Sequence, residues 1–183
     1  VTLIRACNGC QSCTTGQPAY CEAGLPPEGP LATLEGAPIT QAMFCGAFAE
    51  EVVVQPSQLV PVPETIPPEA ACLLSCGVIT GVGVAVNAAR LRPGQTAVVV
   101  GAGGVGLNAV QGARLAGCAR VVAIDVSEEK LADARAFGAT DTILASDERP
   151  WVRLAEIAPR LADAVLLCTG ALPAFESAPR LLG

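Results

Sequence analysis

The chain has 183 residues, of which 51% are hydrophobic, so it can bury a sizeable core in one domain or in one and a half. Eleven basic and 17 acidic residues give a net charge of −6, and without a Lys or Arg cluster this argues against nucleic acid or an anionic membrane as partner. No apolar run approaches the ~18 residues that span a bilayer, and the first residues lack the features of a signal peptide. We therefore expect a cytoplasmic protein whose partners are small molecules.

The first segment, Val1–Arg5, has the apolar pattern of a strand that is entered midway. It has no initiator methionine and no cap, so we expect the chain to be an internal piece of a longer protein. Further along, Phe48–Val54 is a second strand candidate, Leu59–Val62 is a short extended piece and Pro63–Pro68 is a turn, whereas Glu22–Ile39 is rich in Pro and Gly and predicts a loop. Together these segments predict a small β-rich domain.

Four of the nine cysteines, Cys7, Cys10, Cys13 and Cys21, follow one another with the spacing C-x2-C-x2-C-x7-C. Four thiolates on a short loop can surround a zinc ion, and four protein ligands leave no open position for a substrate, so the spacing predicts a structural zinc site. An iron–sulfur cluster is the main alternative, but the bacterial ferredoxin pattern needs three residues before a final Cys-Pro, whereas Cys21 follows seven and precedes Glu22. Unliganded or disulfide-bonded cysteines are the third possibility.

An apolar, Ala-rich pattern runs over Glu69–Leu91 and is interrupted by several glycines. It predicts two helices that meet near Cys76. Because free cysteines are among the most buried residues, the pattern by itself predicts core positions for Cys72 and Cys76.

The stretch Thr96–Asp125 combines an apolar β-branched run, the spacing G-x-G-x-x-G at Gly101, Gly103 and Gly106, a helical pattern from Leu107 and a second apolar run that ends in an acid. This order is the dinucleotide-binding fingerprint. The first glycine permits the turn, the second lets backbone N–H groups approach a pyrophosphate, and the third lets the helix pack on the strand. Asp125 favours NAD over NADP, because a carboxylate accepts hydrogen bonds from ribose hydroxyls and repels a 2′-phosphate.

The rest of the chain continues the alternation of strands and helices. Ser127 is expected to cap a helix that Gly138 ends, and Cys118 and Cys168 are predicted core residues. A complete dinucleotide fold has about six strands in the order 3-2-1-4-5-6, and four of them are counted here. The later elements are expected at Thr140–Leu144 (strand), Pro150–Leu161 (helix), Ala164–Cys168 (strand, followed by Thr169 at the ligand edge) and from Pro173 (helix).

With these features in this order, the chain resembles the zinc-containing medium-chain alcohol dehydrogenases, which share the four-cysteine lobe, the string Cys-Gly-x-x-Thr-Gly at Cys76–Gly81 and the glycine turn. The resemblance implies a structural zinc in the lobe and makes Cys76 a ligand of the catalytic zinc, which overrides its predicted core position. It also implies nicotinamide contacts for Thr80 and Val105 and a ribose contact for Lys130, for which an exposed lysine on a helix is the alternative. The residues assigned to NAD are Thr80, Gly101, Gly103, Gly104, Val105, Gly106, Asp125, Lys130 and Thr169.

The chain also departs from that family. The family's other catalytic zinc ligands, a Cys and a His followed by Glu, would precede Val1, and these 183 residues contain no His. A catalytic zinc takes about three protein ligands, so we expect the catalytic site to be incomplete within this chain. Met43, Phe44 and Cys45 are candidate substrate-cleft residues.

The sequence thus predicts an α/β chain with two parts. Residues 1–77 are expected to form part of a small β-rich (GroES-like) catalytic domain with the zinc lobe, and residues 78–183 a partial Rossmann-type doubly wound parallel sheet. The predicted function is that of an NAD-dependent zinc alcohol dehydrogenase, which acts on an alcohol or on a thiol adduct of an aldehyde. We expect the full-length protein to be a homodimer or homotetramer, and these residues by themselves to be inactive. A non-catalytic, zinc-stabilised dinucleotide-binding module is the alternative, and an iron–sulfur electron carrier is a third possibility.

Overall fold

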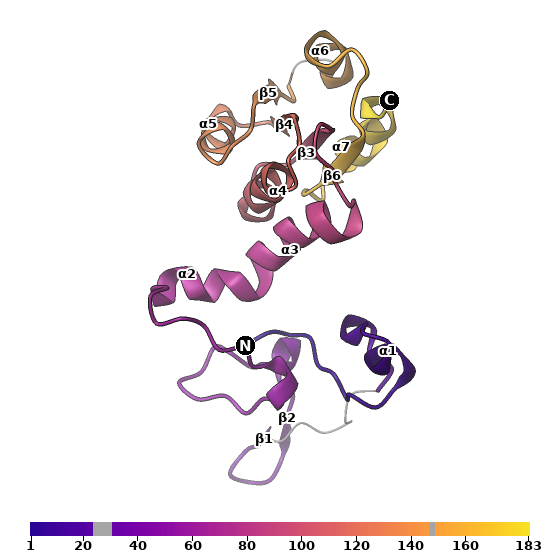
Figure 1. Cartoon of the computed structure of the whole chain (residues 1–183). Coiled ribbons are helices and arrows are strands. Elements are labelled where there is room, and N and C mark those ends of the chain that lie inside the picture. Colours follow the sequence, from indigo (N-terminus) through magenta and orange to yellow (C-terminus); the bar gives the residue numbers. More distant parts are fainter. Residues whose placement is uncertain (24–30, 147–148) are drawn as a thin grey trace. The chain divides into compact units, whose positions relative to one another are not determined.

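A computed structural model describes residues 1–23, 31–146 and 149–183. The chain divides into two compact units, Val1–Ser75 and Cys76–Gly183, which Figure 1 colours from indigo to magenta and from magenta to yellow. This boundary lies two residues before the one expected from the sequence. Residues 24–30, within the expected loop Glu22–Ile39, lie outside the described residues.

The first unit has little regular secondary structure: helices α1 (Gln11–Thr14) and α2 (Pro68–Leu73), short 3-10 turns, and strands β1 (Leu31–Ala32) and β2 (Pro38–Ile39). The two strands pair antiparallel, so part of the expected loop is a small hairpin. The strands expected at Val1–Arg5 and Phe48–Val54 are not formed, because a strand needs a backbone partner and neither segment pairs with any strand in the described part of the chain. The described residues of this unit therefore contain less β-structure than the sequence predicts.

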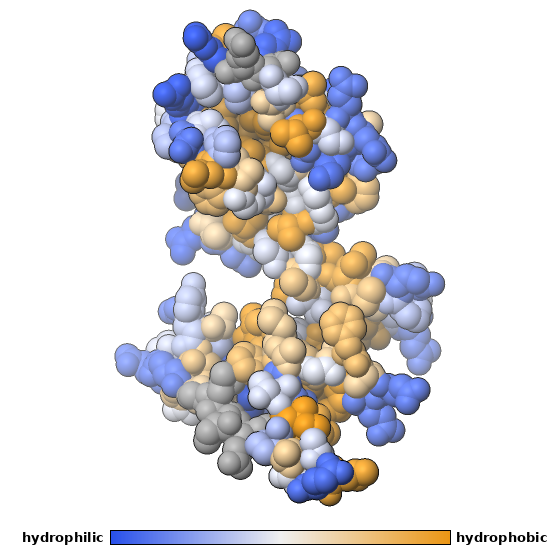
Figure 2. Space-filling view, turned by 180° about the vertical axis from the view of Figure 1, so that it is seen from behind, coloured by the Kyte–Doolittle hydropathy of each residue, from blue (hydrophilic) through white to orange (hydrophobic). Residues whose placement is uncertain are grey.

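A single buried glutamine holds three segments of the first unit together. Gln58 is only 1% exposed, and its Nε2 donates hydrogen bonds to the carbonyl oxygens of Thr2 (2.9 Å) and Phe44 (3.3 Å). Its Oε1 accepts from the N–H of Gln55 at 3.1 Å. Each polar atom of the buried amide has a partner, as burial requires. Otherwise the described residues of this unit bury few side chains, and Figure 2 shows many apolar residues on its visible face.

The apolar stretch that begins with α2 forms one continuous helical segment, Pro68–Ala88. As expected, two α-helices meet near Cys76, but a π-helical segment, Leu74–Val78, joins α2 to α3 (Ile79–Gly83), and a second one, Val84–Ala88, follows. By length and composition this segment could cross a membrane, so the expectation that no run approaches that length was wrong. It is weak evidence for a membrane span, because core helices of soluble proteins pass the same test.

The second unit contains a parallel sheet of four strands in the order β5-β4-β3-β6. This is the order 3-2-1-4 of a dinucleotide-binding fold, as the alternating pattern predicts. The strands are β3 (Thr96–Val100), β4 (Arg120–Asp125), β5 (Asp141–Leu144) and β6 (Ala164–Leu167), and the helices between and after them are α4 (Gly104–Leu115), α5 (Glu128–Ala136), α6 (Pro150–Ile157) and α7 (Leu172–Ser177).

Helices cover both faces of this sheet, as Figure 1 shows for α4 and α5 on one side and α6 and α7 on the other. Because successive strand residues point to opposite faces, Val99 packs with residues of α4 and α5, whereas Val98 packs with Leu154 of α6 and with Leu181. All three valines from Val98 to Val100 are buried. The near-continuous apolar runs in the sequence are those of strands that are buried on both faces.

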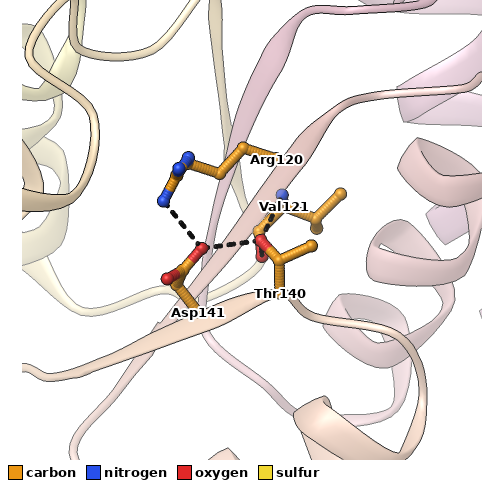
Figure 3. Close-up of polar contacts among 4 residues, drawn as sticks. All are labelled: Arg120, Val121, Thr140 and Asp141. Carbon is orange, nitrogen blue, oxygen red and sulfur yellow. Dashed lines mark hydrogen bonds and ion pairs between the residues drawn. The ribbon is translucent and has the colours of Figure 1, made fainter.

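At the amino end of β4 and β5, side chains extend the pairing of the two strands beyond the ladder (Figure 3). Thr140 Oγ1 accepts a hydrogen bond from the N–H of Val121 at 3.0 Å, and the N–H of Thr140 donates to the Val121 carbonyl oxygen at 2.8 Å. Arg120 forms an ion pair with Asp141, Nη1 to Oδ2, at 3.1 Å. These contacts help to fix the register at the edge of the sheet opposite to the one that receives ligands in such folds.

Close packing of α3 on α4 gives a first prediction. A Cβ atom at Gly81 would lie 2.4 Å from the Val105 carbonyl oxygen and 2.7 Å from the backbone nitrogen of Ala109, so Gly81→Ala must separate the two helices. We expect it to lower the free energy of unfolding by roughly 1–3 kcal/mol.

Gly83→Ala is the matched control, because its Cβ would meet nothing closer than Asn87 Nδ2 at 3.9 Å. In a helix interior it should leave stability unchanged or raise it by up to about 1 kcal/mol. Urea unfolding of both variants measures the difference, and equal stabilities would contradict the proposed packing constraint.

Candidate zinc and dinucleotide sites

The structure brings the four lobe cysteines together. The Sγ atoms of Cys7, Cys10, Cys13 and Cys21 all lie within 4.8 Å of one another, and those of Cys7 and Cys13 are 4.0 Å apart. Four sulfur atoms around a zinc ion at ~2.3 Å stand roughly 3.8 Å from one another. The cluster therefore has the donor type, the number and nearly the spacing of a structural zinc site.

Backbone N–H groups point at three of the four sulfur atoms. The N–H of Cys10 donates to Cys7 Sγ at 3.2 Å, that of Cys7 to Cys21 Sγ at 3.4 Å, and that of Glu22 to Cys10 Sγ at 3.4 Å. The hydrogen bond from Glu22 is the main reason that the pKa of Cys10 is lowered to about 6, and the one from Cys7 lowers the pKa of Cys21. Removal from water raises the pKa of Cys13 to about 11. Zinc binds cysteines as thiolates, so binding of the metal to this cluster releases protons and depends on pH.

Glu22 ties the last cysteine of the lobe to the loop that holds the other three. Its carboxylate accepts hydrogen bonds from both the N–H, at 3.0 Å, and the hydroxyl of Ser12, in the first turn of α1. Both hydrogen bonds lower the pKa of Glu22, and the one from the Ser12 hydroxyl has the larger effect. Because Glu22 follows Cys21 directly, the same contact holds Cys21 beside the short helix, and sequence reasoning did not identify it.

The glycine turn between β3 and α4 has the geometry that the fingerprint requires. Gly101 has φ +95°, and a Cβ there would lie 2.8 Å from the Cys168 carbonyl oxygen. A Cβ at Gly106 would lie 1.8 Å from the carbonyl oxygen of Gly101, so only glycine fits where the helix crosses the strand. A Cβ at Gly103 or Gly104 would meet no atom within 4 Å, so the backbone of these two residues is open to a ligand.

Helix α4 begins at Gly104, three residues before the position expected from the sequence, and Gly103 is its N-cap. The expectation was wrong because glycines carry no periodic apolar signal, although their backbone is helical here. The first helical hydrogen bond runs from the N–H of Leu107 to the carbonyl oxygen of Gly103. The preceding N–H groups of the first turn, including that of Val105, have no helical acceptor and can bind an anion.

A cavity of about 450 Å³ opens at the carboxyl ends of the strands in the second unit. Its lining includes four residues that the sequence assigned to NAD: Gly101, Asp125, Lys130 and Thr169. The strands β3 and β6, whose connections leave in opposite directions, both end there, which is where open α/β sheets bind ligands. The size is within the range of small-molecule sites.

Sequence reasoning missed one aromatic wall of this cavity. Trp151, the chain's only tryptophan, lines it from α6, and the Cζ atom of Arg180 lies 4.7 Å from the centre of the Trp151 ring. The sequence contains a signal for this wall, because Trp151 is the only aromatic residue of the helix after the third strand. Its contact with Arg180 depends on the fold, since the two residues are far apart in the chain.

Asp125, at the end of β4, is only 8% exposed. Its Oδ2 accepts a hydrogen bond from the N–H of Ala102 at 2.7 Å, and its Oδ1 accepts one from the N–H of Ser127 at 3.0 Å. The hydroxyl of Ser127 caps α5, as expected, by accepting from the N–H of Lys130. The acid of the fingerprint is therefore bound to the glycine turn itself.

The residues assigned to a catalytic zinc and to the nicotinamide are less fully assembled. Cys76 is exposed in the first π-helical segment, and in residues 1–23, 31–146 and 149–183 it belongs to no group of three or more potential metal ligands. One thiolate does not make a catalytic zinc site. Thr80 lies in α3 next to Gly81, whose backbone lies against that of Val105 in α4.

The remaining cysteines divide between core and surface. Cys118 is buried, as expected, and Cys168 is partly buried, which raises the pKa of both thiols. The core prediction for Cys72 was wrong: it is exposed, because α2 has no buried residue. Of the candidate cleft residues, Cys45 is buried against Gln58, whereas Met43 and Phe44 are exposed.

Comparison with known proteins identifies relatives of the whole chain. Residues 104–183 match the family described as zinc-binding dehydrogenase. An S-(hydroxymethyl)glutathione dehydrogenase of Saccharomyces cerevisiae is 36% identical over an alignment of 178 residues, and the match covers 90% of this chain and 46% of that protein. The chain thus spans a little under half the length of this curated relative.

Two solved structures resemble the fold. The alcohol dehydrogenase zinc-binding domain protein of Burkholderia ambifaria matches with a TM-score of 0.90 and 30% identity, over 100% of this chain and 52% of that one. The benzyl alcohol dehydrogenase of Acinetobacter calcoaceticus matches with a TM-score of 0.87 and 29% identity, over the same shares.

The sulfur cluster predicts the metal content of the protein. We expect about one zinc ion per chain after purification, and Cys10→Ser should lose most of it, because the serine hydroxyl is a poor replacement for a thiolate ligand. Cys72→Ser is the control, since Cys72 is exposed outside the cluster. Elemental analysis measures both variants. An unaltered zinc content in Cys10→Ser, or a coloured iron-containing protein, would refute the assignment.

Proposed function

We propose that this chain, which belongs to the zinc-binding dehydrogenases of the alcohol dehydrogenase family, has a defined part in a larger enzyme. It supplies the structural zinc lobe and the NAD-binding part of an NAD-dependent zinc alcohol dehydrogenase. The observation that carries the proposal is the convergence of Gly101, Asp125 and Thr169 on one cavity at the carboxyl edge of the sheet. A glycine turn, an acid and a strand end meet there in the arrangement that dinucleotides require.

In this proposal different residues of the chain contact different parts of the cofactor. The open backbone of Gly103 and Gly104 and the first turn of α4 receive the pyrophosphate. Asp125 and Lys130 bind the adenosine ribose, while Thr80, Val105 and Thr169 contact the nicotinamide end. When bound, NAD takes up or gives a hydride, and zinc supplies a Lewis acid for the substrate oxygen.

The substrate class we propose is a small alcohol or the thiol adduct of an aldehyde. The second option follows from the S-(hydroxymethyl)glutathione dehydrogenase among the relatives. Cys76 would hold the catalytic zinc together with ligands from outside these 183 residues, which contain no His. The complete enzyme would act in the cytoplasm as a homodimer or homotetramer.

A non-catalytic module is the second candidate for these residues by themselves. It is favoured by the position of Cys76, which belongs to no potential metal cluster in the described part of the chain. Such a module would keep the structural zinc and bind the dinucleotide without turning over a substrate.

Cofactor binding can be followed without activity. Trp151 lines the cavity and is the only tryptophan, so NAD should change the protein's fluorescence in a saturable way. We expect NADP to bind at least about tenfold more weakly, equivalent to about 1.4 kcal/mol, because its 2′-phosphate would meet the Asp125 carboxylate. Calorimetry provides an independent measurement. Equal affinities would contradict the ribose assignment, and no binding of either cofactor would contradict the proposed function.

Turnover separates the two candidates. Zinc-loaded protein is mixed with NAD and with ethanol, benzyl alcohol, or glutathione plus formaldehyde, and absorbance of the reduced cofactor is recorded. We expect NAD binding without measurable reduction, since Cys76 alone supplies too few ligands for a catalytic zinc. Robust turnover by these 183 residues would overturn both the predicted inactivity and the module description.

A further inference from the structure

We propose that Asp125 is also a positioning residue: its carboxylate holds the glycine turn in the conformation that receives the pyrophosphate, and so couples phosphate binding to ribose recognition. The part of this inference that concerns ligands rests on the proposed function. The part that concerns the turn applies to the protein without any ligand.

The carboxylate takes over where the sheet ladder stops. The N–H of Gly101 still donates to the carbonyl oxygen of Ile124 at 2.8 Å, as a neighbouring strand would. At Gly101 the chain turns with φ +95°, and the next N–H, that of Ala102, donates to Asp125 Oδ2 instead of to a backbone oxygen. The Asp125 carbonyl oxygen is engaged on the other side, where it accepts from the N–H of Ala145 at 2.8 Å.

The N–H of Ala102 would lose its partner without this side chain. Ala102 is only 1% exposed and belongs to the core cluster on the α4 face of the sheet. A buried N–H without a partner is costly, so the turn would rearrange to reach water or another acceptor. Any such movement displaces Gly103, the N-cap of α4, and with it the N–H groups that face the phosphates.

Backbone N–H groups, rather than a basic side chain, contact the carboxylate of Asp125. The ion pairs of the described residues, Arg120 with Asp141 and Arg153 with Glu156, do not include it. A carboxylate has about four acceptor positions, and the amides of Ala102 and Ser127 use two of them. Two positions remain for the hydroxyls of a ribose, so one side chain can hold the turn and the ligand at the same time.

The first test measures the turn without ligand, by hydrogen exchange of individual amides in Asp125→Asn. The amide side chain offers one acceptor oxygen in place of two, and its NH2 group cannot accept from a backbone N–H. We expect exchange at Ala102 or Ser127 to become at least about tenfold faster, while the core amide of Val121 is unchanged. Asp133→Asn, an exposed position on α5, is the matched control.

The second test separates the turn from the ribose. An NAD analogue that lacks both hydroxyls of the adenosine ribose cannot use Asp125 as a ribose ligand. If the side chain also holds the turn, Asp125→Asn binds this analogue about threefold to tenfold more weakly than the unsubstituted protein does. Loss of a negative charge would by itself favour the anionic pyrophosphate, so a weaker affinity has the opposite sign to a simple charge effect.

The outcomes are distinct. Unchanged exchange at both Ala102 and Ser127, or equal affinity of both proteins for the analogue, overturns the positioning role. Faster exchange at Val121 as well indicates general loss of the fold and also counts against it. If the unsubstituted protein binds neither NAD nor the analogue, the proposed function fails, and the exchange measurement decides the conformational role alone.

Discussion

The carbonyl oxygen of Gly101 lies only 1.8 Å from the point where a side chain at residue 106 would place its Cβ. This contact lets α4 start directly against the end of β3. The same constraint exists between α3 and α4, because a Cβ at Gly81 would lie 2.4 Å from the Val105 carbonyl oxygen. The helix is therefore confined between the first strand and α3 by backbone approaches that no side chain would permit, and it begins directly after the glycine turn, whose Gly101 lines the cavity.

The two units are stabilised in different ways. The second unit has apolar clusters on both faces of its sheet. The first unit buries few side chains in the described residues, so polar contacts take a larger share: the Gln58 amide joins three segments, and Glu22 binds Ser12 beside the cysteine cluster. A metal in that cluster would add cross-links where hydrophobic burial is small, which is the general role of structural zinc in small domains.

Asp125 links the local fingerprint to the tertiary fold. As part of a motif it is a predicted ribose ligand at a fixed distance from the glycine turn. In the structure its two oxygen atoms bind the N–H groups of Ala102 and Ser127, so the residue also joins β3, β4 and the start of α5. The ladder between β3 and β4 ends at this point, and the buried carboxylate of Asp125 binds the next backbone N–H group, that of Ala102.

The sequence by itself determined the parallel sheet, its strand order and the glycine turn, because apolar runs, turn glycines and a capping serine are local signals that agree with one another. It also identified the four cysteines that the fold brings together. It misplaced the start of α4, the strands of the first unit and Cys72, since glycine has no periodic signal and strand formation and burial depend on distant partners. Only the tertiary structure decided that Trp151 faces the cavity, that Gln58 joins three segments and that Asp125 binds the turn, because each of these depends on contacts between residues far apart in the chain.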